Sequence, residues 1–372
     1  MIRLIILVVL LLVSLLAILK APAYYLWILA IAVTEYPLIF AGITAFVTLS
    51  GFWVQKFQLA GTIFGILTIA IFLSPVFRAY ALAGKLKNEM SAVFRTEKDH
   101  SEQAFDFWRL FSGIGVVRYN TITYVKYPGI SLDLDFYPAQ AAGKRPCVIV
   151  IHGGSWSSGD SRQLPELNSY LARTGYSVAA INYRMAPRYR YPAPVEDVKA
   201  ALSYLVKHAV ELHIDTTRFV LLGRSAGAQI ALLTAYTLHD PAIKGIVDFY
   251  GPADMVWGYS VPSNPLIMNS RLVMENYLGG TYHQVPQYYK ASSPIEFVNL
   301  SSVPTLIIHG DNDVLVSTIH SQKLNLKLQQ NGVPHYLLRL PWATHGFDYN
   351  LRGPGGQLST YAVGIFLNAI TK

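Results

Sequence analysis

The sequence predicts an α/β domain built on a mostly parallel eight-stranded sheet with helices on both faces, preceded by transmembrane helices. From about residue 116 onward, short apolar runs alternate with helix-forming segments, a pattern typical of parallel strands joined by crossover helices. Residues 1–77, in contrast, carry only four charged side chains, namely Arg3, Lys20, Glu35 and Lys56. We therefore expect a membrane anchor followed by a globular domain of ordinary composition.

Eight runs are predicted to form the strands of this domain. The first two alternate apolar and polar residues around Pro128-Gly129, which indicates a hairpin. The later runs are mostly continuous and apolar, as in strands buried on both faces. The predicted strands cover residues 119–127, 131–137, 147–151, 177–183, 218–222, 244–250, 305–309 and 335–340. The predicted helices cover residues 164–174, 195–212, 226–239, 319–331 and 357–370.

Residues 1–77 are predicted to form an anchor with about three transmembrane helices, over about residues 2–19, 24–53 and 59–77. A bilayer requires roughly 20 apolar residues per helix. The first run could also be a signal peptide, but no clear cleavage site follows it. The second contains Glu35-Tyr36-Pro37, so we predict one tilted or kinked span with Glu35 near the interface. Its aromatic residues at that interface are Tyr24, Tyr25 and Trp27.

The placement of basic residues predicts how the anchor is oriented. Three spans would put Arg3 and Lys56 on one side and the large domain on the other, together with Lys20, Arg78, Lys85 and Lys87. Because positive charge concentrates on the cytoplasmic side, we predict a multi-pass integral membrane protein with a cytoplasmic large domain. Residues 78–115 are predicted to be an amphipathic connector on the membrane surface.

Composition narrows the possible partners. The net charge of +8 is spread along the chain with no basic run, so we predict no nucleic acid partner, although anionic lipid headgroups would attract the chain weakly. The one cysteine, Cys147, lies in a predicted strand, where it is expected to be a small core residue and not a reactive thiol. Nothing in the composition indicates an oligomeric state.

A candidate nucleophile follows the predicted strand 218–222. Gly223-Arg224-Ser225-Ala226-Gly227 lies between that strand and a helix. A serine on such a turn is held in a strained conformation that lifts its hydroxyl out of the sheet, and the flanking glycines permit close approach of other segments. The motif alone is common, but its position between a strand and a helix favours Ser225 as a nucleophile over an ordinary turn residue.

A glycine-rich loop follows the predicted strand 147–151. In the segment His152–Trp156 the backbone N–H groups of Gly153, Gly154 and Ser155 are candidates for an oxyanion hole, together with the N–H group of Ala226. An ordinary glycine turn is the alternative, which the nearby serine motif makes less favoured. His152 is expected to brace the loop, and Trp156 is expected to pack within the fold.

An acid and a base are predicted after the last two strands. Asp313 and Asp311 both follow strand 305–309, and we favour Asp313 because apolar residues follow it, with Asp311 as the fallback. His345 follows the final strand, beside a glycine. The chain order of Ser225, Asp313 and His345 is the nucleophile–acid–base order of one particular fold.

The region from about residue 119 to residue 370 resembles an α/β-hydrolase of the esterase/lipase group that has an H-G-G loop. That group includes hormone-sensitive-lipase-like and feruloyl-esterase-like (BD-FAE type) enzymes. The matching segments are His152–Trp156, Gly159-Asp160, Asn182–Arg184, Tyr191–Ala193, Glu196–Val198, Gly223–Ala228, Tyr250–Pro252, Ser293–Ile295, His309-Gly310 with Asp313, and His345–Phe347. The sequence departs from the group at Arg224, where Asp, Glu, His or Gln is commoner, and at Ser155, which replaces a third glycine.

The resemblance implies a serine hydrolase that cleaves carboxylic esters through an acyl-enzyme and requires no cofactor or metal. Residues 253–290 are expected to form a lid insertion that sets specificity for a small-molecule or lipid ester. An acyltransferase, an amide hydrolase or formamidase, and a catalytically silent membrane binding module are the alternatives. The layout of the N-terminus is also similar to that of membrane-bound prenylcysteine methylesterases. Arg224 is expected to pair with a nearby carboxylate in preference to an anionic headgroup.

Overall fold

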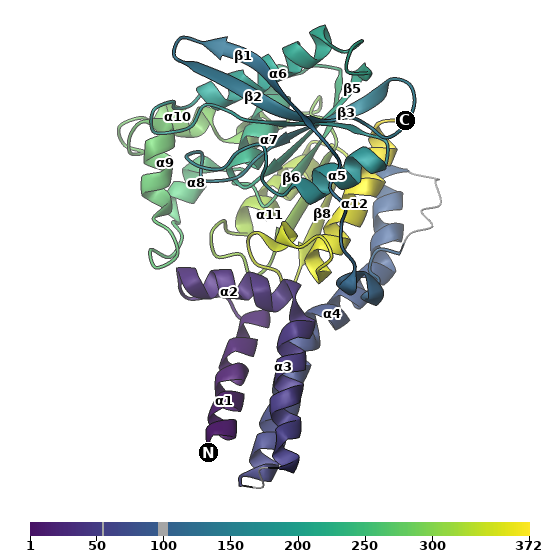
Figure 1. Cartoon of the computed structure of the whole chain (residues 1–372). Helices are drawn as coiled ribbons and strands as arrows, with labels where there is room; N and C mark the ends of the chain where they lie inside the picture. Colours follow the sequence, from purple (N-terminus) through teal and green to yellow (C-terminus); the bar gives the residue numbers. More distant parts are fainter. Residues whose placement is uncertain (54–55, 96–102) are drawn as a thin grey trace.

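The computed structural model describes residues 1–53, 56–95 and 103–372. An α/β domain stands on a narrow stalk of helices formed by the N-terminal part of the chain (Figure 1). The sheet has eight strands in the order β1-β2-β4-β3-β5-β6-β7-β8. β1, β2 and β4 pair antiparallel, and β4 and the remaining strands pair parallel with their neighbours. The sheet is therefore mixed, with an antiparallel hairpin at one edge of a parallel core.

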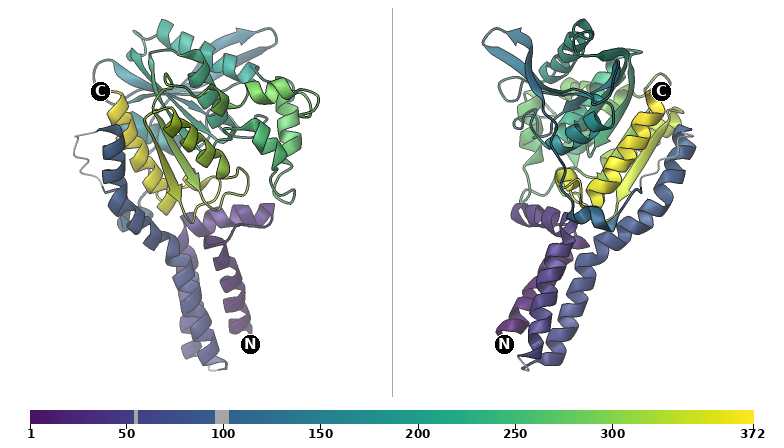
Figure 2. Two further views of the ribbon diagram at one scale, coloured as in Figure 1. Left: turned by 180° about the vertical axis from the view of Figure 1, so that it is seen from behind. Right: turned by 45° about the vertical axis from the view of Figure 1, so that its right-hand side comes forward.

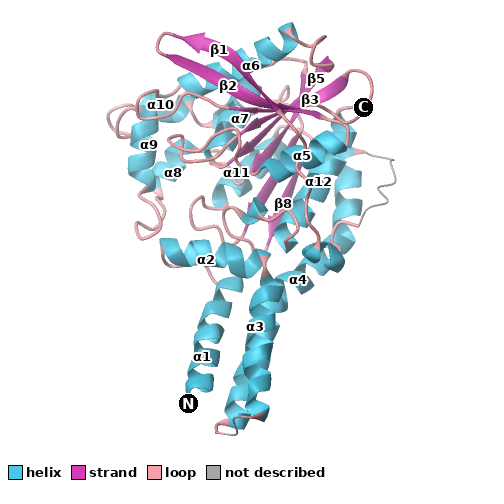
Figure 3. Ribbon diagram, in the orientation of Figure 1, coloured by secondary structure: helices cyan, strands magenta, loops and turns pink. Residues whose placement is uncertain are grey.

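All eight predicted strands are present, with ends that differ by a few residues from those expected. They are β1 (Asn120–Tyr127), β2 (Ile130–Tyr137), β3 (Arg145–Ile151), β4 (Ser177–Ile181), β5 (Ile214–Arg224), β6 (Ile243–Phe249), β7 (Thr305–Gly310) and β8 (His335–Leu340). The central strands are apolar on both sides because helices cover both faces (Figure 3). In β3, Cys147 and Ile149 belong to one hydrophobic core and Val148 and Val150 to the other.

Helices cover the sheet in two layers. One layer consists of α6 (Ala193–Lys207), α7 (Ala226–Leu238) and α11 (Ile319–Gln330). The other consists of α5 (Pro165–Arg173), α12 (Pro354–Ile370) and the C-terminal part of α4 (Gln58–Phe94). The connection from β3 to β4 passes through α5 on one face of the sheet, and the connection from β4 to β5 passes through α6 on the other face. Loops on either side of this reversal point form a crevice at the carboxyl ends of the strands.

The predicted lid insertion is helical and lies between β6 and β7. It contains α8 (Met255–Ser260), α9 (Ser270–Leu278) and α10 (Pro286–Ala291), and a short 3-10 helix, η4 (Pro294–Phe297), follows it. Several of its apolar side chains, including Met255, Tyr277 and Tyr289, belong to the same core as α6 and α7. This packing holds the insertion against the domain.

The N-terminal helices differ from the three expected spans. They are α1 (Ile2–Ser14), α2 (Tyr24–Glu35), α3 (Pro37–Leu49) and the first part of α4, with short 3-10 turns η1 (Leu15–Ala17) and η2 (Ser50–Phe52). Among the described residues, one helix, α4, is long and apolar enough to cross a membrane. A second span would require α2 and α3 to act together, but they are bent by 88° at Tyr36. Of the two forms predicted for residues 24–53, tilted or kinked, the structure shows a kinked one, because Pro37 begins a new helix.

The stalk consists of α1, α3 and the first part of α4, whereas α2 lies across the base of the α/β domain (Figures 1 and 2). The predicted connector over residues 78–115 is also different from the structure. Helix α4 continues without a break past Pro75 to Phe94 and packs beside α12 and β8, where Tyr336 donates a hydrogen bond to Glu89 over 2.5 Å. This part of α4 covers the sheet, and residues 96–102 of the predicted connector lie outside the described residues.

Candidate active site

Ser225 occupies the strained turn that the sequence predicts. It lies between the end of β5 and the start of α7, with φ +53° and ψ −119°. The positions two residues before and after it have to be glycine: a Cβ atom on Gly223 would come within 2.3 Å of the Gly227 carbonyl oxygen, and one on Gly227 within 2.2 Å of the Ile151 oxygen. The Ser225 N–H donates to the Phe249 carbonyl oxygen over 2.8 Å. This tight packing at the carboxyl ends of β3, β5 and β6 keeps the serine at the crevice.

The loop after β3 lies against the serine turn and has an unusual backbone. Gly154, Ser155 and Trp156 have positive φ values of 119°, 54° and 59°. A Cβ atom on Gly153 would come within 3.4 Å of the Ser225 Cβ atom. The backbone N–H groups of Gly154, Ser155 and Ala226 donate to no other described residue. They are therefore free to bind a developing oxyanion.

Gly153 does not fit the predicted set of oxyanion donors. Its N–H group donates to the Gln163 side-chain oxygen over 2.8 Å, so this donor is already occupied. Gln163 belongs to the segment between β3 and α5, and no sequence motif marks it. Its hydrogen bond fixes the loop and leaves the next two N–H groups as the available donors.

His152 and Trp156 support the loop, as expected. The His152 ring stacks on Tyr183 at 4.3 Å, and its Nδ1 lies 2.7 Å from the Gly153 oxygen. Burial lowers the pKa of His152, which favours the neutral ring. Trp156 stacks on Tyr277 at 4.5 Å and donates to Gln229 over 2.9 Å. Both rings are therefore held by neighbours within the fold.

Asp313 contacts the predicted base directly. Its Oδ2 lies 2.7 Å from Nδ1 of His345, and its Oδ1 accepts the N–H groups of Leu315 and Val316 over 2.8 and 2.9 Å. The competing residue Asp311 instead pairs with Arg339 over 2.9 Å at a solvent-exposed position. The structure thus brings Asp313, and not Asp311, to His345.

A second histidine shares the same carboxylate oxygen. His309, at the end of β7, places Nε2 at 3.1 Å from Asp313 Oδ2 and Nδ1 at 2.6 Å from Ser321 Oγ. Burial alone would raise the pKa of Asp313, but the charge interaction and hydrogen bonds with His345 and His309 outweigh it and hold that pKa well below its usual range. Asp313 therefore stays ionised over the whole physiological pH range.

Arg224 pairs with a carboxylate, as predicted. Its Nε lies 2.5 Å from Oδ2 of Asp348, and both side chains are buried. Asp348 belongs to the short 3-10 helix η5 (Phe347–Tyr349) that follows His345. The Tyr250 hydroxyl donates to the other Asp348 oxygen over 2.5 Å, and the Tyr250 ring lies 4.3 Å from the His345 ring. Arg224 therefore ties the serine turn to the loop that carries His345.

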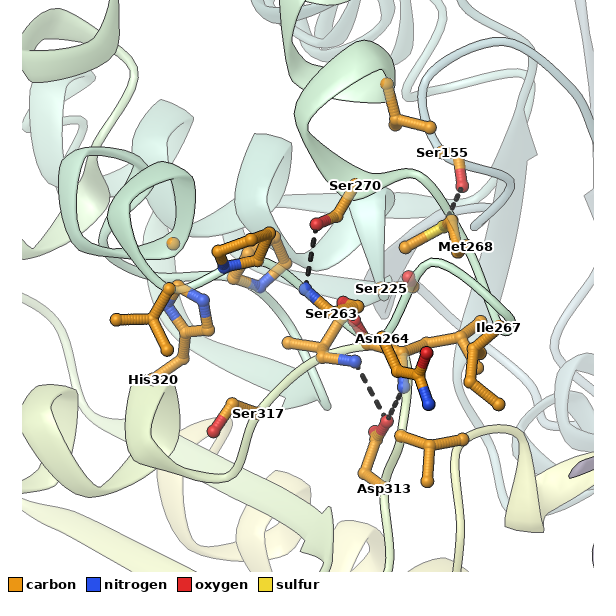
Figure 4. Close-up of a pocket in the computed structure, with 18 of the residues that line it drawn as sticks. Ser155, Ser225, Ser263, Asn264, Ile267, Met268, Ser270, Asp313, Ser317 and His320 are labelled. Atoms are coloured by element: carbon orange, nitrogen blue, oxygen red, sulfur yellow. Dashed lines mark hydrogen bonds between the residues drawn. The ribbon is translucent and has the colours of Figure 1, made fainter. Parts of the chain in front are cut away.

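A pocket of about 470 Å³ opens beside Ser225 and Asp313 (Figure 4). This volume lies in the range of about 300–1,000 Å³ that is typical of small-molecule sites. The lid insertion supplies much of its apolar wall, and the other walls come from the loop after β3, the turn after β7 and residues 20–22. Its apolar lining includes Val261, Ile267, Met268, Val273, Met274 and Leu315. Burial lowers the pKa of His320, at one end of the pocket, to about 3, so this ring is neutral.

Three residues that shape this site have no site role predicted from the sequence. Gln163 carries no motif, and His309 is only part of a matching segment. Trp27 is predicted to lie at a membrane interface, but its indole N–H donates to the His345 carbonyl oxygen over 3.0 Å. Trp27 lies in a segment predicted to be transmembrane, and no local pattern indicates such a distant contact. Across residues 1–53, 56–95 and 103–372, no group of three or more His, Cys, Asp or Glu side chains is arranged to hold a metal ion.

The chain is similar in sequence to known esterases. The family profile described as BD-FAE matches residues 132–328. The esterase LipQ of Mycobacterium tuberculosis is 29% identical over 231 residues, which cover 58% of this chain and 54% of LipQ. The probable isoprenylcysteine alpha-carbonyl methylesterase ICMEL1 of Oryza sativa is 28% identical, over 64% of this chain and 59% of that protein. The chain thus spans little more than half the length of these curated relatives.

Solved structures share the fold. EstE1, a thermostable carboxylesterase cloned from a metagenomic library, superposes with a TM-score of 0.61 and 20% identity, over 79% of this chain and 98% of EstE1. At that identity the likeness shows the fold alone. The α/β-hydrolase esterase fold expected from the motifs is therefore confirmed.

Proposed function

The chain belongs to the BD-FAE family, and on that premise we propose that it is a carboxylic ester hydrolase with Ser225 as its nucleophile. The observation that carries this proposal is that a strained serine at φ +53° lines the same pocket as Asp313, which is joined to His345 over 2.7 Å. Free backbone N–H groups lie beside the same serine. Nucleophile, oriented base and oxyanion donors are the three parts that acyl transfer requires.

The proposed reaction passes through an acyl-enzyme. Because Nδ1 of His345 is held by Asp313, Nε2 is the nitrogen left to take the Ser225 proton. The serine oxygen then bonds to the ester carbonyl carbon, and the N–H groups of Gly154, Ser155 and Ala226 bind the negative oxygen. As the C–O bond to the alcohol breaks, the proton passes from His345 to the departing alcohol. Water repeats the sequence on the acyl-enzyme and releases the acid.

One contact of this mechanism forms only in the proposed complex with substrate. The Ser225 hydroxyl has no hydrogen-bond partner among the described residues. Catalytic hydrogen bonds are commonly long in the unliganded state and shorten when substrate binds. The proposal therefore places the Ser225–His345 contact in the complex.

We also propose that the stalk anchors the enzyme in a membrane, with the α/β domain on the cytoplasmic side. The large apolar side chains exposed on the stalk support the anchoring. So does Arg3, the one charged residue of α1, whose guanidinium donates to the carbonyl oxygens of Val47 and Thr48 and to the Gln58 side chain. These acceptors replace hydrogen bonds to water that the guanidinium would lose inside a bilayer.

Labelling with a fluorophosphonate tests the nucleophile. We expect the full-length protein in detergent to be labelled at Ser225 and to hydrolyse 4-nitrophenyl esters. Ser225→Ala should lose both the label and nearly all hydrolysis, because no other group forms the acyl-enzyme. Ser317→Ala, which removes another hydroxyl that lines the same pocket, should keep both. Ester hydrolysis by Ser225→Ala at the native rate would overturn the assignment.

A further inference from the structure

The N-terminal segment forms one wall of the candidate active site. Lys20, Ala21 and Pro22, which connect α1 to α2, line the same pocket as Ser225 and Asp313. Two hydrogen bonds fasten this connection to the lid insertion: Asn264 donates to the Pro22 oxygen over 3.2 Å, and the Tyr24 N–H donates to the Leu266 oxygen over 3.1 Å. The pocket is therefore incomplete without residues that the sequence assigns to the membrane anchor.

Helix α2 also holds the loop that carries the base. The Trp27 indole N–H donates to the His345 carbonyl oxygen over 3.0 Å. A Cβ atom on the next residue, Gly346, would come within 3.4 Å of the Ile31 side chain, so α2 packs closely on this loop. Trp27 acts on the reaction through His345 and is a positioning residue.

The far end of α2 is tied to the α/β domain at a third point. Glu35 Oε2 accepts the Gly355 N–H over 2.9 Å, and the Glu35 carbonyl oxygen accepts the Asn350 side chain over 2.7 Å. Directly after this contact the chain bends by 88° into α3 and enters the stalk. The wall of the pocket thus lies where the stalk meets the α/β domain (Figure 1).

We infer that the segment Lys20–Glu35 completes the active site and directs it toward esters with long apolar chains that lie in a membrane. This inference rests on the proposed ester hydrolysis. The pocket of about 470 Å³ has an apolar lid wall, and the Lys20–Pro22 wall leads directly into α1 of the stalk. With the stalk in a bilayer, a chain that extends past Pro22 would reach the membrane surface, whereas a short acyl chain would end near Ser225.

The wall is tested with full-length protein reconstituted in phosphatidylcholine vesicles. The ratio of kcat/KM for 4-nitrophenyl decanoate to that for the acetate is measured, and active sites are counted by fluorophosphonate labelling. Pro22→Trp, which adds bulk at the wall, should lower this ratio at least tenfold, and Lys20→Trp serves as a second variant. Leu19→Trp is the matched control, because Leu19 is exposed and lies outside the pocket lining; it should leave the ratio unchanged.

The positioning role of Trp27 is tested in the same assay. Trp27→Phe removes the donor to the His345 carbonyl oxygen. It should lower kcat per labelled site about three- to tenfold, with KM within twofold, because one hydrogen bond that holds the backbone of the base is lost. Trp108→Phe, at a largely exposed tryptophan, should change neither constant.

The outcomes separate the inference from the proposed function. A wild-type protein that hydrolyses no ester and is not labelled at Ser225 rejects the proposed function. If the wild type is labelled and active, two results reject the role of Lys20–Pro22 as a wall that selects long chains. One is an unchanged decanoate-to-acetate ratio of kcat/KM in both Pro22→Trp and Lys20→Trp, and the other is an equal loss of kcat/KM on both esters. An unchanged kcat in Trp27→Phe rejects the positioning role.

Discussion

At the scale of single residues, the choice between two neighbouring aspartates is decided by their surroundings. Asp311 pairs with Arg339 at the surface, whereas Asp313 is buried and receives hydrogen bonds from His345 and from two backbone N–H groups. A buried carboxylate costs free energy unless such partners stabilise its charge. The interactions with His345 and His309 outweigh the effect of burial and hold the pKa of Asp313 well below its usual range. An ionised Asp313 can both orient the His345 ring and stabilise the imidazolium that forms during the proposed reaction.

The two aspartates give matched variants. We expect Asp313→Asn to lower kcat by about three to four orders of magnitude with little change in fold, because the amide favours the wrong His345 tautomer. Asp311→Asn should stay within about twofold of the wild type, since it removes only a surface ion pair. Steady-state kinetics on a soluble ester measures both. Equal losses in the two variants would contradict the role of Asp313.

At the scale of elements, α2 is the piece that joins the stalk to the α/β domain. A side-chain oxygen of Glu35 accepts an N–H group in the first turn of α12, where helices carry unpaired donors. The acid that interrupts an apolar segment of the sequence thus caps a helix more than 300 residues away in the chain. The 88° bend confirms the predicted kink beside Glu35. The hydrogen bond from Gly355 gives Glu35 a structural role that no sequence pattern predicted.

Removing this cap should destabilise the protein. Glu35→Ala leaves the buried Gly355 N–H unpaired, which we expect to cost about 1–3 kcal/mol and to lower the thermal unfolding midpoint by several degrees. Glu35→Gln keeps an acceptor and should lose less. Glu211→Ala, at a largely exposed glutamate, is the control and should leave the midpoint unchanged. A midpoint of Glu35→Ala equal to that of the control would show that the cap contributes nothing.

At the scale of the whole molecule, the stalk is apolar on the outside. Helix α1 with η1 and helix α3 with η2 each extend about 24 Å at 1.5 Å per residue, somewhat less than the roughly 30 Å of a bilayer core. Such a mismatch costs only fractions of a kcal/mol per ångström. The exposed side chains of the stalk include Ile5, Val9, Leu12, Ile39, Ile43, Phe46, Ile63 and Ile66. These features support the proposed anchoring.

Membrane anchoring predicts how the protein fractionates. The wild type should stay in the membrane pellet after alkaline carbonate extraction, and a C-terminal epitope should be cut by external protease only after permeabilisation. The double variant Ile63→Lys, Ile66→Lys should release a measurable fraction of the protein from the membrane pellet, because each charge inside a bilayer costs about 2.5–3.5 kcal/mol. Lysines at Val206 and Val210, exposed on the α/β domain, should release none. Complete extraction of the wild type would contradict the anchor.

The order of strands and helices, and the positions of Ser225, Asp313 and His345 after strand ends, could be predicted from local sequence patterns. Strands and helices can be predicted in this way because their apolar periodicity and turn residues lie within a few positions of one another. In this fold the nucleophile, acid and base follow particular strands, so the strand order also locates them. Three features appear only in the folded chain: the Gly153 N–H group is bound to Gln163, His309 shares Asp313 with His345, and α2, which meets α3 at 88°, contacts His345 through Trp27. These contacts join residues far apart in the chain, and no local pattern specifies which distant partner a buried polar group will meet.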